Sequence, residues 1–145
     1  MDYQLTPEWR IRLEQDYKRR LEDDQLVLWI TGRTILAVVF RFAQHAQHTH
    51  PDKRDELLQK LKTRAEQNKM DIFESQSGDL MRFATLEPED IGGGHLRLAL
   101  HAFTAAVDTC LQTAFYFDKP ADLQWAIQAW EAIQYFPQRV KENNQ

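Results

Sequence analysis

The segment Leu26–Ala43, LVLWITGRTILAVVFRFA, constrains the fold most, because apolar residues occur on nearly every face of it. Its β-branched residues also permit strands, but its length without turn residues favours a helix. A helix that is apolar all round lies at the centre of a bundle. Arg33 in the middle and Arg41 near the end interrupt the apolar stretches and exclude a membrane span. We therefore expect a buried helix over about residues 24–47, in which Gly32 marks a close helix crossing.

A second heavily apolar segment covers residues 95–117 and predicts another central helix. Its large apolar residues recur at helical spacing, and the alanines between them have small side chains that would give a narrow helix. The spaced residues are Leu96, Leu100, Phe103, Val107, Cys110, Leu111 and Phe115. We expect this helix to pack against the helix at 24–47.

Three amphipathic segments complete the prediction. The Thr6-Pro7-Glu8 sequence is typical of a helix start, with a hydroxyl cap, a proline at the first position and an acid in the first turn. A helix beginning near Asp52 and one over residues 121–136 follow from their apolar stripes, and residues 70–94 predict short helices and loops. The expected architecture is all-α, a single helical domain over residues 1–145 with about five helices.

Composition agrees with one globular domain, since 43% of the 145 residues are hydrophobic and 28% are charged. Cys110 is the single cysteine, so the chain cannot form an internal disulfide. No apolar stretch follows a basic start at the N-terminus, so nothing suggests a secretion signal. The expected location is the cytoplasm.

The distribution of charge is uneven along the chain. Residues 1–70 hold 13 lysines and arginines against 11 aspartates and glutamates, whereas residues 71–145 hold 5 against 11. Such an acidic half repels nucleic acid and favours a basic protein partner. We predict that the partner-binding residues are the six acids Asp71, Glu74, Asp79, Glu87, Glu89 and Asp90.

The cluster His45, His48 and His50 is a candidate metal site, because imidazoles three residues apart share one helix face. Histidines near a helix C-terminus also interact favourably with its negative end, and no further ligand motif completes a zinc site. We expect no bound metal and no cofactor.

Two segments pair an arginine with a histidine four positions later, Arg41 with His45 and Arg97 with His101. The pattern resembles the HEPN ribonuclease family, which is all-helical, although Phe42 and Leu98 stand where that family usually has a polar residue. The resemblance covers five residues and implies metal-independent RNA cleavage, in which the arginine holds the phosphate and the histidine moves a proton. A coincidental spacing on a helix is the simpler interpretation.

Three other features are interpreted structurally. Gly92-Gly93-Gly94 predicts a loop rather than a phosphate cradle, because no lysine follows and three acids precede it. Cys110 lies in an apolar segment and is expected to be inert. Tyr116 and Trp125 fall off the inward stripes and could anchor a partner.

The sequence therefore favours a protein-binding function without catalytic residues. The size and the acidic half suit a bacterial immunity protein or antitoxin that covers a toxic enzyme, possibly a nuclease. The alternatives are a HEPN-like ribonuclease and a structural or adaptor protein, and the oligomeric state is left open.

Overall fold

The computed structural model describes residues 1–42 and 53–137, which form mainly antiparallel β-sheet. The strands are β1 (Asp2–Gln4), β2 (Trp9–Arg12), β3 (Lys18–Glu22), β4 (Gln25–Ile30), β5 (Arg33–Arg41), β6 (Asp71–Ser77), β7 (Leu80–Gly92), β8 (His95–Ala105), β9 (Thr109–Phe117) and β10 (Ile133–Tyr135). The helices are α1 (Lys53–Gln67) and α2 (Leu123–Glu131), with the 3-10 turn Pro120–Asp122 before α2. The all-α bundle prediction is therefore wrong.

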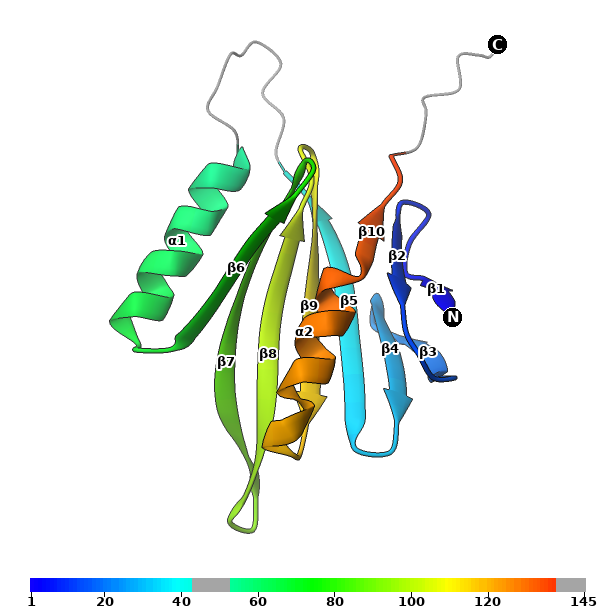
Figure 1. The fold of residues 1–145 in the computed structure, drawn as a ribbon, viewed down its shortest axis with the longest axis vertical. Coiled ribbons are helices and arrows are strands. Elements are labelled where there is room, and N and C mark those ends of the chain that lie inside the picture. Colours follow the sequence, from blue (N-terminus) through cyan, green and yellow to red (C-terminus); the bar gives the residue numbers. More distant parts are fainter. Residues whose placement is uncertain (43–52, 138–145) are drawn as a thin grey trace.

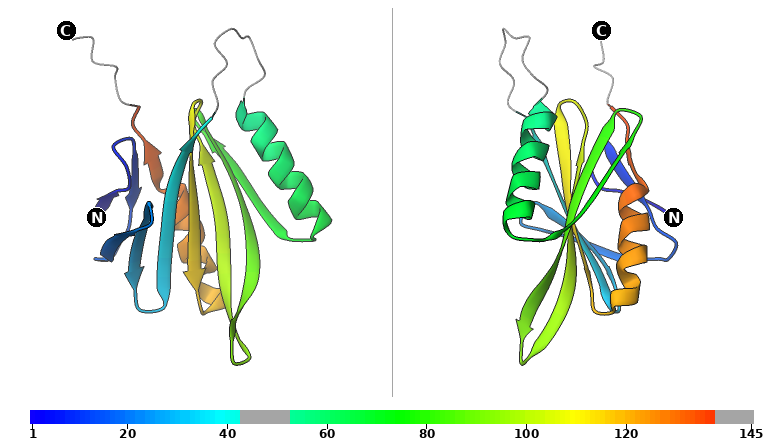
Figure 2. Two further views of the ribbon diagram at one scale, coloured as in Figure 1. Left: turned by 180° about the vertical axis from the view of Figure 1, so that it is seen from behind. Right: turned by 60° about the vertical axis from the view of Figure 1, so that its left-hand side comes forward.

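The described strands form two sheets, a large one and a small one (Figure 1). The larger has the order β3-β4-β5-β9-β8-β7-β6 and the smaller has the order β1-β2-β10. Helix α2 and the small sheet cover one face of the large sheet, here called the first face. Helix α1 lies on the opposite side, at the β6 edge (Figure 2), and this side is called the second face.

The expected central helix at 24–47 is instead the hairpin of β4 and β5. Ile30 pairs with Arg33, and the turn between them contains Gly32 at a φ of +82°. A Cβ built on Gly32 would meet nothing within 4 Å, so the glycine serves the turn and not a close crossing. The helical prediction failed because both faces of these strands carry apolar residues, which erases the alternating pattern of a one-sided strand.

The expected helix at 95–117 is likewise a hairpin, formed by β8 and β9. Ala105 pairs with Cys110, and the turn closes with a 2.8 Å hydrogen bond from the Ala106 N–H to the Thr109 carbonyl. Ala99 and Ala102 point to opposite faces and are both fully buried. Apolar residues on both faces satisfy any assumed period, so the helical spacing was uninformative.

The expected first helix is also replaced by strands. The Thr6 hydroxyl accepts hydrogen bonds from the backbone N–H groups of Glu8 and Trp9, at 3.2 and 3.1 Å, and so caps the turn between β1 and β2. Asp23 and Asp24, at φ values of +47° and +66°, form the turn between β3 and β4. Two consecutive residues with positive φ are typical of a tight β-hairpin turn.

The predicted helices near residues 53 and 121 are confirmed, the second in shorter form. Helix α1 buries Ala65 and half-buries the leucine stripe, as its pattern indicated. Helix α2 buries Ala126 and Trp130 against the first face. The sequence also indicates a turn at Ser75–Gly78, but Ser75–Ser77 belong to β6 and only Gly78 lies in the turn. The expected break at Gly92–Gly94 is a turn as well, and both turns join strands rather than helices.

The core lies between the first face, α2 and the small sheet. Its largest fully buried side chains include Trp9, Trp130, Phe115 and Phe117. The buried Trp130 indole donates a 3.1 Å hydrogen bond to the Thr104 hydroxyl, which satisfies both groups. This core fixes α2 beside the beginning of β5, where a cavity opens.

Candidate functional site

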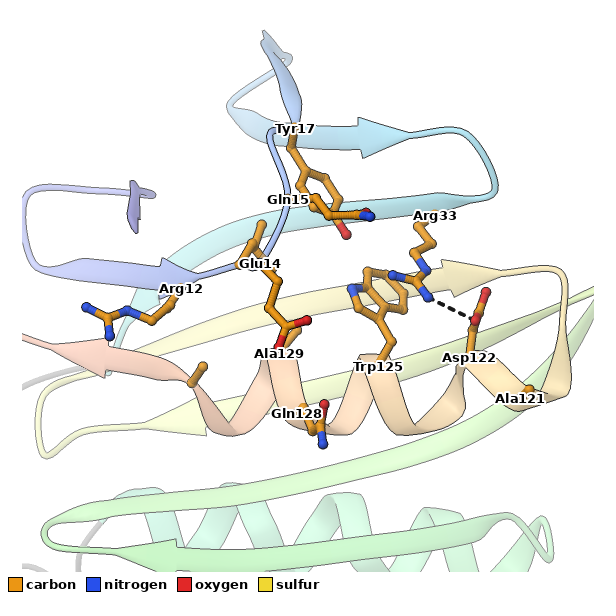
Figure 3. Close-up of a pocket in the computed structure, with 12 residues that line it drawn as sticks. Arg12, Glu14, Gln15, Tyr17, Arg33, Ala121, Asp122, Trp125, Gln128 and Ala129 are labelled. Carbon is orange, nitrogen blue, oxygen red and sulfur yellow. Dashed lines mark hydrogen bonds and ion pairs between the residues drawn. The ribbon is translucent and has the colours of Figure 1, made fainter. Parts of the chain in front are cut away.

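A cavity of about 640 Å³ lies between the connection from β2 to β3, the start of β5 and helix α2 (Figure 3). Its volume falls within the range of small-molecule sites, about 300–1,000 Å³. The wall combines charged, amide and aromatic side chains, mainly Glu14, Tyr17, Arg33, Asp122 and Trp125. These residues come from segments far apart in sequence, which the core brings together.

Arg33 is the central side chain of this wall. Its Nη2 donates to Asp122 Oδ1 at 3.0 Å, and its guanidinium carbon lies 4.9 Å from the centroid of the Trp125 ring. The ion pair and hydrogen bond with Asp122 raise the pKa of Arg33 above its ordinary value. The positive charge of Arg33 is thus balanced by Asp122, and its guanidinium is held in one orientation.

Tyr17 and Trp125 form the rigid floor of the cavity. Burial raises the pKa of the Tyr17 hydroxyl, and the neighbouring Arg33 and Trp125 side chains oppose part of this rise. The Trp125 ring makes edge contacts with Phe115 and Phe117, at centroid distances of 5.9 and 6.2 Å. The floor is therefore preformed by core packing.

Glu14 lies on the opposite wall, with its carboxylate turned toward α2 (Figure 3). Arg12 beside it is paired with Asp2 at 2.9 Å, and Arg33 is paired with Asp122. Within residues 1–42 and 53–137, Glu14 has no ion-pair or hydrogen-bond partner for its side chain. It is the one uncompensated charge in the described lining.

The six predicted partner-binding acids do not share one face. Strand alternation places Glu74, Glu87 and Glu89 on the second face, and Asp71 and Asp90 on the opposite side. Asp79 lies in the turn between β6 and β7. Glu74 pairs with Lys62 of α1 at 3.6 Å. Whether these acids bind a partner stays a prediction.

Arg97 and His101 do lie together, but on strand β8 instead of a helix. Both contact Glu89, Arg97 through Nη2 at 3.3 Å and His101 through Nε2 at 3.3 Å. His101 also lies 3.7 Å from Glu87, and the Arg97 guanidinium lies 4.0 Å from the centroid of the Tyr116 ring. The all-helical fold implied by the HEPN resemblance is contradicted, and the two residues belong to an ion-pair cluster.

The histidine cluster and Cys110 were the other candidate sites in the sequence. His45, His48 and His50 lie outside the described residues. Within the described part of the chain, no group of three or more histidine, cysteine or acidic side chains could hold a metal ion. Cys110 is fully buried, and burial raises its pKa to about 12, as expected for an inert thiol.

Sequence reasoning missed the cavity residues Glu14, Tyr17, Arg33 and Asp122. An arginine inside a long apolar segment was the available signal, because a half-buried arginine needs a partner. Nothing in the sequence identified that partner, since Asp122 follows Arg33 by 89 residues.

Comparisons of the chain with protein-family models, curated proteins and solved structures return no match. Neither described helix has the length and apolarity needed to cross a bilayer.

Proposed function

We propose that this chain acts by binding another protein, which docks on the second face of the large sheet. The supporting observation is a patch of half-buried apolar side chains from β4, β5 and β9, here called the open patch. It consists of Trp29, Leu36, Val38, Phe40, Ala114 and Tyr116. Contiguous apolar surface of this kind marks interaction sites, and tryptophan and tyrosine are common anchors in them.

The position of α1 leaves this patch accessible in the described part of the protein. Helix α1 packs mainly against β6 and β7, at the far edge of the sheet (Figure 2). The distance from β8 to β4 is about 14 Å at the usual strand spacing, and a helix with its side chains is about 10 Å wide. One apolar helix face of a partner therefore fits beside α1.

The acidic second half of the chain supports a partner with some basic character. Beside the patch the charges are mixed, since Glu89 contacts Arg97 and the Arg97 and Arg20 guanidiniums lie over the Tyr116 and Trp29 rings. The attraction would come from the longer-range field of residues 71–145, which hold 11 acids against 5 lysines and arginines. Neutralisation of a toxic enzyme, as by an immunity protein or antitoxin, is the role we propose for such binding. Complementary charge chiefly speeds this kind of association.

The test is protection against a toxin encoded by a neighbouring gene. The chain should form a complex with that toxin and restore growth when both are co-expressed. Leu36→Glu should abolish protection, because it buries a charge under the partner. Gln134→Glu is the matched control, since Gln134 is exposed on β10 in the other sheet.

Circular dichroism of both variants must match the parent protein, so that lost protection reports binding. Full protection by a folded Leu36→Glu variant would contradict docking on the open patch. The acidic residues have a separate test, the variant with Asp71→Lys and Asp79→Lys, because neither aspartate belongs to the cluster of Arg97, His101, Glu87 and Glu89. A slower association with weaker salt dependence would support charge steering; an unchanged rate would exclude these two acids.

A further inference from the structure

We propose that the cavity beside α2 binds a small organic cation, an ammonium or guanidinium group carried on a short apolar body. The cavity lies on the first-face side of the sheet, opposite the open patch, so this site is independent of the proposed protein-binding function. The charges of its lining, its apolar floor and its rigidity each support this ligand class.

The charge argument rests on Glu14. Arg12 and Arg33 are each held by an aspartate, so the lining leaves one free carboxylate in the part of the chain that the structure describes. An anionic ligand would meet this carboxylate and would have to displace Asp122 to reach Arg33. A cation pairs with Glu14 without breaking any existing contact.

The floor supplies the apolar contact. Trp125 is half-buried, and Ala129 of α2 and Ala132, which follows the end of α2, line the cavity beside it. Gln128 also lines the cavity. An amine with an aromatic or aliphatic body can thus place its head at Glu14 and its body over Trp125 and the alanines.

Arg33 makes the cavity rigid. Its contacts with Asp122 and Trp125 hold β5 and α2 in fixed relation. A preformed wall reduces the ordering cost of binding. Arg33 therefore acts on the ligand by positioning Trp125.

The experiment compares three probes of similar size by calorimetry and by the NMR signal of the Trp125 indole N–H. Phenethylamine should bind, and 3-phenylpropanoate and phenethyl alcohol should bind at least fivefold more weakly. Glu14→Gln should weaken phenethylamine binding about fivefold, as expected for an exposed ion pair. Glu66→Gln on α1 is the matched control and should leave binding unchanged, since Glu66 is exposed on the opposite layer.

Two further probes identify the source of the cation. Tighter binding of N-acetyl-arginine methylamide or N-acetyl-lysine methylamide than of phenethylamine would assign the site to a basic side chain of a peptide. Tighter binding of phenethylamine would assign it to a free amine. Preference for 3-phenylpropanoate, equal binding of all three aryl probes, or unchanged affinity in Glu14→Gln would overturn the proposal. Loss of toxin protection in Leu36→Glu would not affect this result.

Discussion

Arg33 at the start of β5 and Asp122 at the start of α2 form a 3.0 Å ion pair between residues 89 positions apart. The pair joins the large sheet to the helix that covers its first face. Their side chains are 27% and 20% exposed, so solvent screens the pair only in part. It therefore contributes more than a typical surface ion pair.

Removal of either partner should destabilise the protein and alter the cavity. Asp122→Asn should lower the free energy of unfolding by about 1–2 kcal/mol, between the values for exposed and buried pairs. Chemical denaturation of Arg33→Gln, Asp122→Asn and the double variant gives the coupling energy between them. Strictly additive losses would show that the pair is not coupled.

The buried Arg82 is expected to anchor β10 to the large sheet. Its Nη2 donates a 2.9 Å hydrogen bond to the Ile133 carbonyl, and burial lowers its pKa. Arg82→Ala should cost about 2–4 kcal/mol, because it leaves a void and an unpaired carbonyl. Arg82→Met should cost less, since it fills the volume without a buried charge.

Hydrogen exchange at β10 separates anchoring from general stability. Both Arg82 variants should accelerate exchange of the Ile133–Tyr135 amides more than exchange in β8. Uniform acceleration in both strands would argue against a specific role at β10.

The Trp130 indole and the Thr104 hydroxyl should be energetically coupled. Thr104→Val leaves the buried indole N–H without its acceptor and should cost about 1–3 kcal/mol. Adding Trp130→Phe removes that N–H, so the double variant should lose less than the sum of the single losses. Thermal and denaturant unfolding of the three variants measures the difference, and a zero coupling energy would contradict the hydrogen bond.

Cys110 should make stability depend on pH in the alkaline range. Burial raises its pKa from 9.0 to about 12, so the folded protein retains the thiol proton where the unfolded chain has lost it. The contribution is complete below pH 9 and is lost as the pH rises toward 12.

Between pH 9 and pH 11, this loss should amount to about 2 kcal/mol of unfolding free energy. Cys110→Ala lacks the thiol, so its stability should fall less over the same interval. Tyr135, whose pKa burial also raises to about 12, titrates in both proteins and cancels in the comparison. Parallel pH curves for the two proteins would contradict the prediction.

Local features were predictable from the sequence by itself. The leucine stripe of α1 lies on one face of a helix, so its 3.6-residue period is visible without knowledge of the fold. The turns at Gly78 and Gly92–Gly94 were also visible, because glycine readily adopts the positive φ that they use. In each case the decisive interaction lies within a few residues of chain.

The β4–β5 and β8–β9 hairpins required the tertiary structure. Their strands lie inside a sheet with apolar side chains on both faces, and two-sided burial removes the alternation that identifies a strand. The cavity required it too, since Glu14, Arg33 and Trp125 converge only after β5 pairs with β9 and α2 packs on the first face. Long-range strand pairing decided the fold and the site, because contacts between distant residues leave no local pattern in the sequence.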